Sequence, residues 1–376
     1  MALISIAWLF SNVSKKSARY QDARKGITSN MSTKPIFVRA TRIPINWTPD
    51  LSIYASESFL KAVGDEYGWL GGIDDSGKLR CILPYTIIRK AILRIVRFRV
   101  ETIPVGKELA IDEEKSFLIS TIEYFRSIGA DMIMPASTNT IFRTYPDGAM
   151  AAPYGSYIID LSQPEDIMWK NMNRKLRQNI NTALKDGATI RSGIEYLDAT
   201  YKSVRDTFKR SKLPFMNYES FKRFVHGLGE NGKIMVVHYR GVAQSHVLFA
   251  FSNYCAYAIY AGNVPDLHQG ANKLIYWEAI RLFKQIGVQR YDFVGARINP
   301  EKGSKQEALN SFKKRYGAEL KQGYMWKYSL HPLKYRLYSI AARIRSGGDI
   351  VDAERHKLKN PNGAANDNPE LTIPSV

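Results

Sequence analysis

The chain has 376 residues, 45% hydrophobic and 24% charged, a composition typical of globular proteins and long enough for two domains. Its two cysteines lie far apart and its six histidines show no metal-binding spacing, which argues against a disulfide framework and a metal site. Lys and Arg number 54 against 35 acids, and the net charge of +19 indicates an anionic partner: nucleic acid, a phosphate-bearing substrate or acidic lipid.

The N-terminal segment is the least domain-like part of the chain. The apolar run at residues 2–10 is too short to span a bilayer, which needs about 20 residues. No positive charge precedes this run and no clear cleavage site follows it, as a signal peptide would require. Residues 14–25 are polar and basic. We therefore expect a cytoplasmic protein with a mobile basic leader at residues 1–34.

The first domain is expected to begin near Ile36. A helix is predicted over residues 52–67, with strands at 69–73 and 79–84 joined by a turn at 74–77. The next stretch holds seven basic residues and no acid: Lys78, Arg80, Arg89, Lys90, Arg94, Arg97 and Arg99. Such a run forms either a solvated face, whose aliphatic stems cover apolar neighbours, or a surface that contacts phosphate or membrane.

One helix–strand step occurs twice in the sequence. Residues 125–129 (Phe-Arg-Ser-Ile-Gly) match residues 283–287 (Phe-Lys-Gln-Ile-Gly), and Ile122 matches Ile280 at the same offset of 158 residues. Each copy is predicted to end a helix and to lead into a short apolar strand. The sequence therefore predicts an internal duplication.

A helix predicted over residues 166–185 joins the two halves and has two distinct faces. Its apolar face carries Trp169, Met172, Leu176, Ile180 and Ala183. Its polar face is basic and carries Lys170, Arg174, Arg177, Asn181 and Lys185. Because acids are absent from this stripe, it is either a basic solvated face or a surface for an anion.

The second half alternates strands and helices. Helices are predicted at 197–209, 218–228 and from 268 to 287, and strands at 188–192, 234–239, 244–252, 254–260 and 290–294. This order predicts an α+β fold, with a mixed, mostly antiparallel sheet flanked by helices.

The C-terminal part divides into two stretches. Residues 331–346 are predicted as a basic amphipathic helix, which either packs on the domain or lies on an acidic membrane at the inner face of the cell membrane. Residues 347–376 are polar and are predicted to be disordered.

The loop–helix–strand step with Tyr291-Asp-Phe293, followed by Phe312-Lys-Lys-Arg-Tyr-Gly317, resembles the FemAB group of the GNAT acyltransferase superfamily, which are peptidoglycan-bridge aminoacyltransferases and their relatives. The resemblance runs from about residue 36 to 330. It implies tandem GNAT-like domains, predicted at residues 35–163 and 164–330, with the second catalytic.

The resemblance also bears on the acyl donor. Relatives that use acetyl-CoA show Arg/Gln-x-x-Gly-x-Gly/Ala before the helix, whereas this chain has Leu267, Gly270 and Asn272 at those positions. Only the glycine matches, so a standard CoA cradle is not expected. The implied donor is an anionic carrier, either aminoacyl-tRNA or an acyl carrier protein, with acyl-CoA as the alternative.

Candidate catalytic residues are His268, Asp292 and Tyr260. His268 lies in the loop expected nearest the acceptor and has the pKa range of a general base, although a lone loop histidine is more often incidental. Asp292, on a buried strand, either catalyses or anchors a loop. Tyr260 and Asn263 flank the expected cleft and would orient the acceptor, with Tyr154 as their first-domain counterpart.

Candidate anion-binding residues come from three places. Arg177 lies on the basic linking helix, and the backbone N–H groups at Gly270 open a helix. Phe312–Gly317 resembles the family's Phe-Lys motif, in which a lysine contacts substrate phosphate. That lysine is Lys313 or Lys314, and one of them faces the site because adjacent helical residues point about 100° apart.

Together these features predict an acyl- or aminoacyltransferase. Its acceptor would be an amine on a phosphorylated sugar or a lipid-linked cell-envelope precursor, for peptidoglycan or exopolysaccharide biosynthesis. The alternatives are an N-acyltransferase that uses acyl-CoA or acyl carrier protein, and a nucleic-acid-binding protein without catalysis. The basic residues are not interleaved with aromatics in a recognisable nucleic-acid-binding motif, which disfavours the last class.

Overall fold

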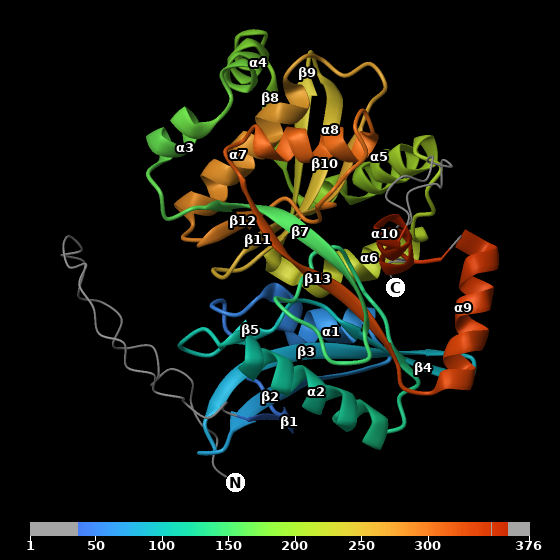
Figure 1. The fold of residues 1–376 in the computed structure, drawn as a ribbon. Helices are drawn as coiled ribbons and strands as arrows, with labels where there is room; N and C mark the ends of the chain where they lie inside the picture. The colour runs from blue at the N-terminus through green and yellow to red at the C-terminus, as the bar shows by residue number, and fades with distance from the viewer. Residues whose placement is uncertain (1–36, 347, 360–376) are drawn as a thin grey trace.

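The computed structural model describes residues 37–346 and 348–359, and the leader predicted at residues 1–34 lies outside them (Figure 1). The first repeat consists of β1 (Val38–Ile43), α1 (Glu57–Val63), β2 (Glu66–Asp74), β3 (Leu79–Lys90), β4 (Leu93–Phe98), β5 (Ile103–Pro104), α2 (Ile111–Ser127) and β6 (Met132–Ile133). The helix predicted at 52–67 ends earlier, at Val63, because Gly64 is extended and residues 66–73 pair with β3.

The second half of the chain contains β7 (Met150–Asp160), α3 (Glu165–Asn171), α4 (Arg174–Lys185), β8 (Thr189–Ser192), α5 (Leu197–Arg210), α6 (Tyr218–Leu228), β9 (Gly232–Tyr239), β10 (Val242–Phe251), β11 (Ala256–Asn263), α7 (Ala271–Gln285), β12 (Arg290–Asp292), α8 (Lys305–Lys314) and β13 (Glu319–Ser329). Two further helices follow, α9 (Pro332–Ser346) and α10 (Ile350–Lys359). We refer to β8–β12 with their helices as the second repeat.

The described strands form a mixed, mostly antiparallel sheet with a symmetric order, β1-β2-β3-β4-β6-β13-β7-β12-β11-β10-β9-β8. Reading inward from both ends, β1, β2, β3, β4 and β6 of the first repeat correspond to β8, β9, β10, β11 and β12 of the second, whereas β5 lies off this path and pairs with β3. The parallel pair β4·β6 corresponds to the parallel pair β11·β12. This is the predicted α+β class, with two repeats of the same strand order in tandem.

The central strands exchange partners between the repeats. β7 follows the first repeat in the chain but pairs with β12, whereas the end of β13 pairs with β6. β7 and β13 also pair with each other over residues 150–158 and 319–327, and they run together between the two halves in Figure 1. The domain limits of 35–163 and 164–330 stay a proposal, since these strands cross between the halves.

The duplicated sequence step forms the same local structure in both repeats. Gly129 and Gly287 both have positive φ, 72° and 85°. After each helix, backbone N–H groups bond back to the carbonyls of Phe125 and Phe283. Both phenylalanines are fully buried beneath their sheets. Glycine is required here because the left-handed conformation that ends each helix is unfavourable for other residues.

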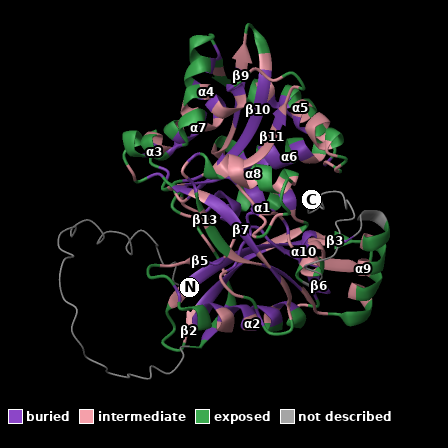
Figure 2. Ribbon diagram, turned by 45° about the horizontal axis from the view of Figure 1, so that its top comes forward, coloured by how far each residue is buried: buried purple, intermediate pink, exposed green. Residues whose placement is uncertain are grey.

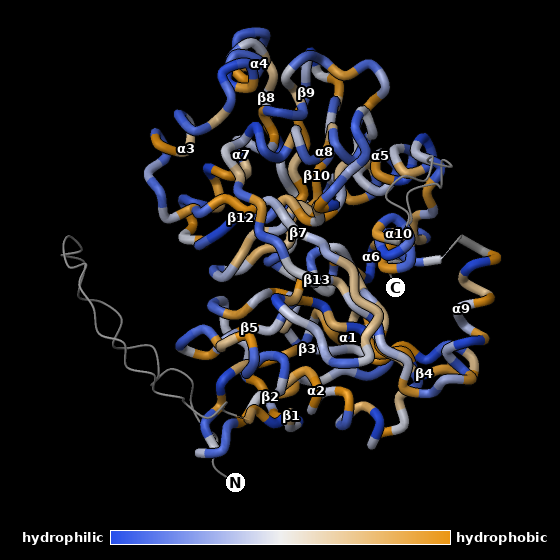
Figure 3. Tube along the Cα trace, in the orientation of Figure 1, coloured by the Kyte–Doolittle hydropathy of each residue, from blue (hydrophilic) through white to orange (hydrophobic). Residues whose placement is uncertain are grey.

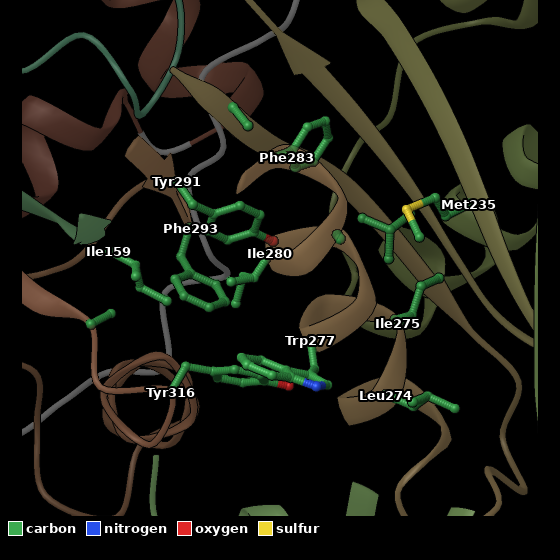
Figure 4. Packing of buried hydrophobic residues seen from close by; sticks show 14 of the residues in the cluster. Ile159, Met235, Leu274, Ile275, Trp277, Ile280, Phe283, Tyr291, Phe293 and Tyr316 are labelled. Carbon is green, nitrogen blue, oxygen red and sulfur yellow. The ribbon is translucent and has the colours of Figure 1, made fainter. Parts of the chain in front are cut away.

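The two repeats share part of their hydrophobic core. Figure 4 shows the packing within the second repeat, where Phe283, Tyr291 and Phe293 gather beside α7. A second cluster joins both repeats: Phe59 of α1 stacks edge-on against Phe224 of α6, with ring centroids 5.5 Å apart. Burial is continuous through both halves in Figure 2. The halves are therefore held together by apolar contacts as well as by strand exchange.

The linking helix predicted over residues 166–185 is broken in two. Met172 is extended, and the side chain of Asn173 accepts hydrogen bonds from the backbone N–H groups of Lys175 and Leu176 to begin α4. An asparagine in this position competes with helix continuation by capping a new helix. The predicted apolar face is correct, since Leu176 and Ile180 are buried.

The prediction that the chain is disordered from residue 347 is wrong in part, because residues 350–359 form α10. Ile350 and Val351 are buried against Tyr154 and Met325. Lys327 of β13, which is buried, forms ion pairs with Asp349 and Asp352 at 2.7 Å. These partners lie in other elements, so the local composition of the tail gave no sign of them. Residues 360–376 lie outside the described part of the chain.

Two expectations on composition can be compared with the structure. Cys81 and Cys255 are both buried, and neither forms a disulfide within the described residues. Within the described residues, no helix combines the length and apolarity needed to cross a bilayer.

Candidate active site

A cavity of about 520 Å³ lies where the two repeats meet. The first repeat and the loop after β6 contribute Tyr54, Phe59, Arg99 and residues 136–139. The second half contributes residues from α5, β11, α7 and α8, and from the loop that follows β12. Ile350 of α10 completes the wall. The cavity therefore exists only because both repeats and the C-terminal helix are folded together.

The lining of the cavity is cationic. Four basic side chains reach it: Arg99, Arg297, Lys305 and Lys313. None of the described residues that line it is Asp or Glu. A partly enclosed site with cations and no lining carboxylate favours an anionic ligand, because the walls screen its charge less than bulk water does.

Arg99 is the most unusual of these cations, because only 6% of the residue is exposed and no carboxylate among the described residues pairs with it. Its guanidinium donates from Nε to Thr86 Oγ1 at 2.9 Å and from Nη2 to the Val63 carbonyl at 2.6 Å. Burial, and then the nearby Arg97, lower the pKa of Arg99 to about 9. A buried charge of this kind is costly unless an anion accompanies it.

The loop after β12 is held in an unusual conformation beside the cavity. Val294 has a φ of 55°, a strained value for a β-branched residue, and Gly295 follows with a φ of 74°. Asp292 fixes this turn, since its carboxylate accepts hydrogen bonds from Ser156 Oγ and from the Val294 N–H at 2.6 Å. Burial raises the pKa of Asp292. Strain of this kind is common at functional sites.

Of the two adjacent lysines, Lys313 lines the cavity and Lys314 is exposed outside it. The Lys313 ammonium donates to the carbonyls of Val294, at 2.8 Å, and Gly295, so it also fastens the strained loop. Burial lowers the pKa of Lys313 to about 8. An ammonium has three donors, and these two bonds leave one for a ligand.

Two amide side chains in the lining have buried oxygens without a hydrogen-bond partner in the described structure, Asn263 Oδ1 and Asn272 Oδ1. Tyr260 and Tyr154 also line the cavity. The Tyr260 ring is packed against Phe215 and Phe224, with centroids 5.2 and 5.8 Å away. The cavity thus offers acceptors for an N–H donor beside a rigid aromatic wall.

Asp292 does not line this cavity, and its two bonds are those of a loop anchor. His268 also lies outside the lining. Its Nε2 is 2.9 Å from Asp186, which directly follows α4, and its ring stacks on Tyr239 with centroids 4.0 Å apart. A general base must reach the reacting amine, and the structure does not bring His268 to the cavity.

Gly270 and Arg177 are likewise elsewhere. Gly270 has a φ of 93°, and a Cβ there would lie 2.0 Å from the backbone oxygen of Asn179, so α4 covers the start of α7. The glycine is explained by this close packing, without an anion at the helix N-terminus. Arg177 is partly buried on α4 and its Nε has no partner in the described structure.

Sequence reasoning missed Arg99 as an individual site residue. It fell within the acid-free basic run at residues 78–100, which carried the right sign of charge. In the structure Arg89 of this run is exposed whereas Arg97 and Arg99 are buried. No local pattern separates these arginines, because the burial depends on contacts with α1 and with the second repeat.

Known proteins resemble this chain in part of its sequence and in its fold. Residues 170–304 match the model of the acetyltransferase (GNAT) domain. FemX shares the fold with a TM-score of 0.56 at 14% identity, over 78% of this chain and 95% of FemX. The L-PGS structure from Bacillus licheniformis gives a TM-score of 0.45 at 13% identity, over 75% and 94% of the two chains. A tandem GNAT protein from the clavulanic acid biosynthesis pathway gives 0.42 at 10%, over 73% and 87%.

A comparison with curated proteins gave no match. The resemblance inferred from the sequence is confirmed: the chain carries a GNAT acetyltransferase domain and has the fold of FemX. It is an enzyme of the acyltransferase class.

Proposed function

We propose that this acyltransferase passes an activated acyl or aminoacyl group from an anionic carrier to an amine of a phosphorylated sugar or cell-envelope precursor. The observation that carries this proposal is the cavity between the repeats, which has four basic residues in its lining and no acid. An acceptor with phosphate or carboxylate groups would meet Arg99 and Lys313 there. Charge-assisted hydrogen bonds of this kind are the stronger ones in proteins.

The acceptor amine would lie beside Asn263 and Asn272, whose unpartnered oxygens can accept its N–H groups. In the reaction the amine nitrogen attacks the donor carbonyl carbon, so a C–N bond forms. The bond from that carbon to the oxygen or sulfur of the carrier breaks. The proton that the amine loses passes to this oxygen or sulfur, so the carrier leaves as an alcohol or a thiol. Holding amine and carbonyl together supplies much of the rate gain, so no covalent enzyme intermediate is required. Tyr260 is the proposed residue for orienting the amine.

The proposed donor is a large carrier, with aminoacyl-tRNA preferred. Three contacts support this choice by covering the N-terminus of α7 with α4: Gly270 against Asn179, Gln269 Nε2 to Asn179 Oδ1 at 3.1 Å, and His268 to Asp186. A pyrophosphate placed on this helix N-terminus would meet the carbonyl oxygen of Asn179. Free CoA would therefore bind poorly, with a Kd expected at about millimolar.

The decisive experiment offers three donors with one acceptor. Purified protein is incubated with aminoacyl-tRNA, acyl carrier protein or acetyl-CoA, together with a UDP-linked amino sugar and with amine-bearing peptidoglycan precursors. Mass spectrometry then detects the N-acylated product. We expect product with a carrier-bound donor and little or none with acetyl-CoA.

Binding measurements at two salt concentrations complete the test. Affinity for tRNA should fall with salt because phosphate contacts release counterions. Micromolar, salt-insensitive binding of acetyl-CoA with efficient transfer would replace the carrier hypothesis by the acyl-CoA alternative. Equal binding of charged and uncharged RNA, without product from any donor, would contradict the enzymatic proposal and favour a nucleic-acid-binding protein.

A further inference from the structure

Helix α9 has two apolar faces, and only one of them is covered. On the inner face, Tyr335 and Tyr338 pack against a buried cluster that includes Ile95 and Met132. On the outer face, four aliphatic residues are largely exposed: Leu333 at 70%, Leu337 at 64%, Ile340 at 49% and Ile344 at 83%. Their spacing of four, three and four residues places them in one stripe along the helix. Figure 1 shows α9 at the edge of the molecule, beside β4, and Figure 3 shows its alternating apolar and polar positions.

Basic residues flank this stripe. The segment Pro332–Ser346 contains no acid. Arg336 and Arg343 are exposed and form no ion pair in the described part of the chain. Lys334, near the start of the helix, pairs with Asp131 at 2.9 Å. The outer face therefore combines exposed aliphatic side chains with uncompensated positive charge.

The turn between β3 and β4 extends this surface. Lys334 Nζ donates to the Ile92 carbonyl at 3.2 Å, which places the turn beside the beginning of α9. Ile92 is 71% exposed, and its neighbours Lys90 and Ala91 are exposed as well. We call Lys90, Ile92 and the exposed residues of α9 the α9 face. Two separate segments thus present aliphatic and basic side chains together.

We infer that the α9 face docks on the surface of an anionic lipid bilayer. Leu333, Leu337, Ile340 and Ile344 would enter the headgroup boundary while the arginines meet lipid phosphates, as in interfacial amphipathic helices. Fifteen residues of helix span about 22 Å, short of a hydrocarbon core of about 30 Å, so the helix lies in the plane of the surface. A second copy of this chain is a poorer occupant, because two such faces would repel each other.

This inference does not depend on the proposed reaction, since the α9 face contributes no residue to the cavity lining. It would place the enzyme where lipid-linked acceptors lie. The test is flotation of the full chain with vesicles of phosphatidylcholine alone or mixed with phosphatidylglycerol. We expect the protein to float with the anionic vesicles and to remain unbound with the neutral ones, with less binding at high salt.

Variants separate the apolar and basic contributions. The double substitutions Leu337→Glu/Ile344→Glu and Arg336→Glu/Arg343→Glu should each weaken vesicle binding about tenfold or more. Matched controls are Ile194→Glu, at an isoleucine that is 58% exposed elsewhere, and Lys202→Glu/Lys222→Glu on α5 and α6. Both controls should bind as the unaltered protein does. Because all these positions are exposed, the Tm of every variant should stay unchanged.

Three outcomes would overturn the inference. One is equal flotation with neutral and anionic vesicles. Another is unaltered binding by both α9 variants. A third is size-exclusion chromatography that shows a dimer which Leu337→Glu/Ile344→Glu dissociates, since a second copy would then cover the face. Transfer to a water-soluble acceptor should be the same for all variants, so a failed reaction and a failed docking surface are told apart.

Discussion

At the level of single residues, the cavity is characterised by basic side chains that differ in position and burial. Lys313 and Lys314 are neighbours with the same chemistry, yet only Lys313 lines the cavity. Arg99 is buried and pairs with no carboxylate in the part of the chain that the structure describes, so an anionic ligand would meet it at little further desolvation cost. Asn263 and Asn272 add unpartnered acceptors. These residues distinguish the site from an ordinary basic surface.

Replacing Arg99 should weaken the binding of an anionic acceptor. For Arg99→Gln we expect the Kd of a UDP-linked amino sugar to rise about tenfold or more, because a charge-assisted contact contributes roughly 1.5–3 kcal/mol. Isothermal titration calorimetry measures this change. The same amino sugar without its phosphates serves as the control ligand and should show little change. An equal loss for both ligands would mean that the substitution only disturbs the cavity.

Lys313 should make acceptor binding dependent on pH. Burial lowers the pKa of Lys313 to about 8, so the ammonium is charged below that pH and neutral above it. If the charged form binds the anion, affinity should fall about tenfold between pH 7 and pH 9. The guanidinium has a higher ordinary pKa than the ammonium, so Lys313→Arg should move the loss of affinity to higher pH. A pH profile shared by both proteins would exclude Lys313 as the titrating group.

At the level of secondary-structure elements, α10 contributes to the cavity but was not predicted from the sequence. Its Ile350 lines the cavity, and Lys327 of β13 holds the start of the helix through Asp349 and Asp352. Burial alone would lower the pKa of Lys327, but the two carboxylates raise it above its ordinary value. This small ionic cluster connects the start of α10 to β13 at the centre of the sheet.

Removing the Lys327 charge should release α10. For Lys327→Met we expect a loss of roughly 2 kcal/mol, below the range for fully buried pairs because Asp352 is 30% exposed. Hydrogen exchange should show faster exchange in residues 350–359 than in α7. Asp352→Asn is the milder control, because it leaves the pair with Asp349 intact. Unchanged exchange in α10 would show that Ile350 and Val351 suffice to hold it.

At the scale of the whole molecule, the two repeats are interdependent. β6, the last strand of the first repeat, pairs with β13, and β12, the last strand of the second repeat, pairs with β7. Helix α1 also packs closely on α6. The cavity takes residues from both repeats, so its geometry follows from their assembly. Ligand-binding sites often lie at junctions of this kind.

Separated halves should therefore fail to fold. We expect residues 35–163 and 164–330, expressed alone, to lack a cooperative thermal transition, because the second piece loses β7 and the first loses β13 and the shared core. The thermal transitions of both halves and of the full chain are measured by circular dichroism during heating. A sharp transition in residues 164–330 alone would show that the second half is an independent domain.

Local sequence patterns were enough to predict the features that depend on near neighbours. The match between residues 125–129 and 283–287 predicted the repeat, because both segments have the same apolar residues at the same spacing before a glycine that can end a helix. The helical spacing of the apolar residues in α4 predicted which of its faces is buried. The excess of basic residues predicted an anionic partner, because net charge is a sum that folding leaves unchanged.

Which of these residues come together at the cavity depends instead on contacts between distant parts of the chain. Arg99 reaches the cavity because α1 and the second repeat enclose it, and His268 lies elsewhere because Asp186 and Tyr239 hold its ring. The helix α10 forms because Lys327, more than 20 residues upstream, pairs with its first acids. Burial and ion pairing join residues that are distant in the chain, so no local periodicity can reveal them.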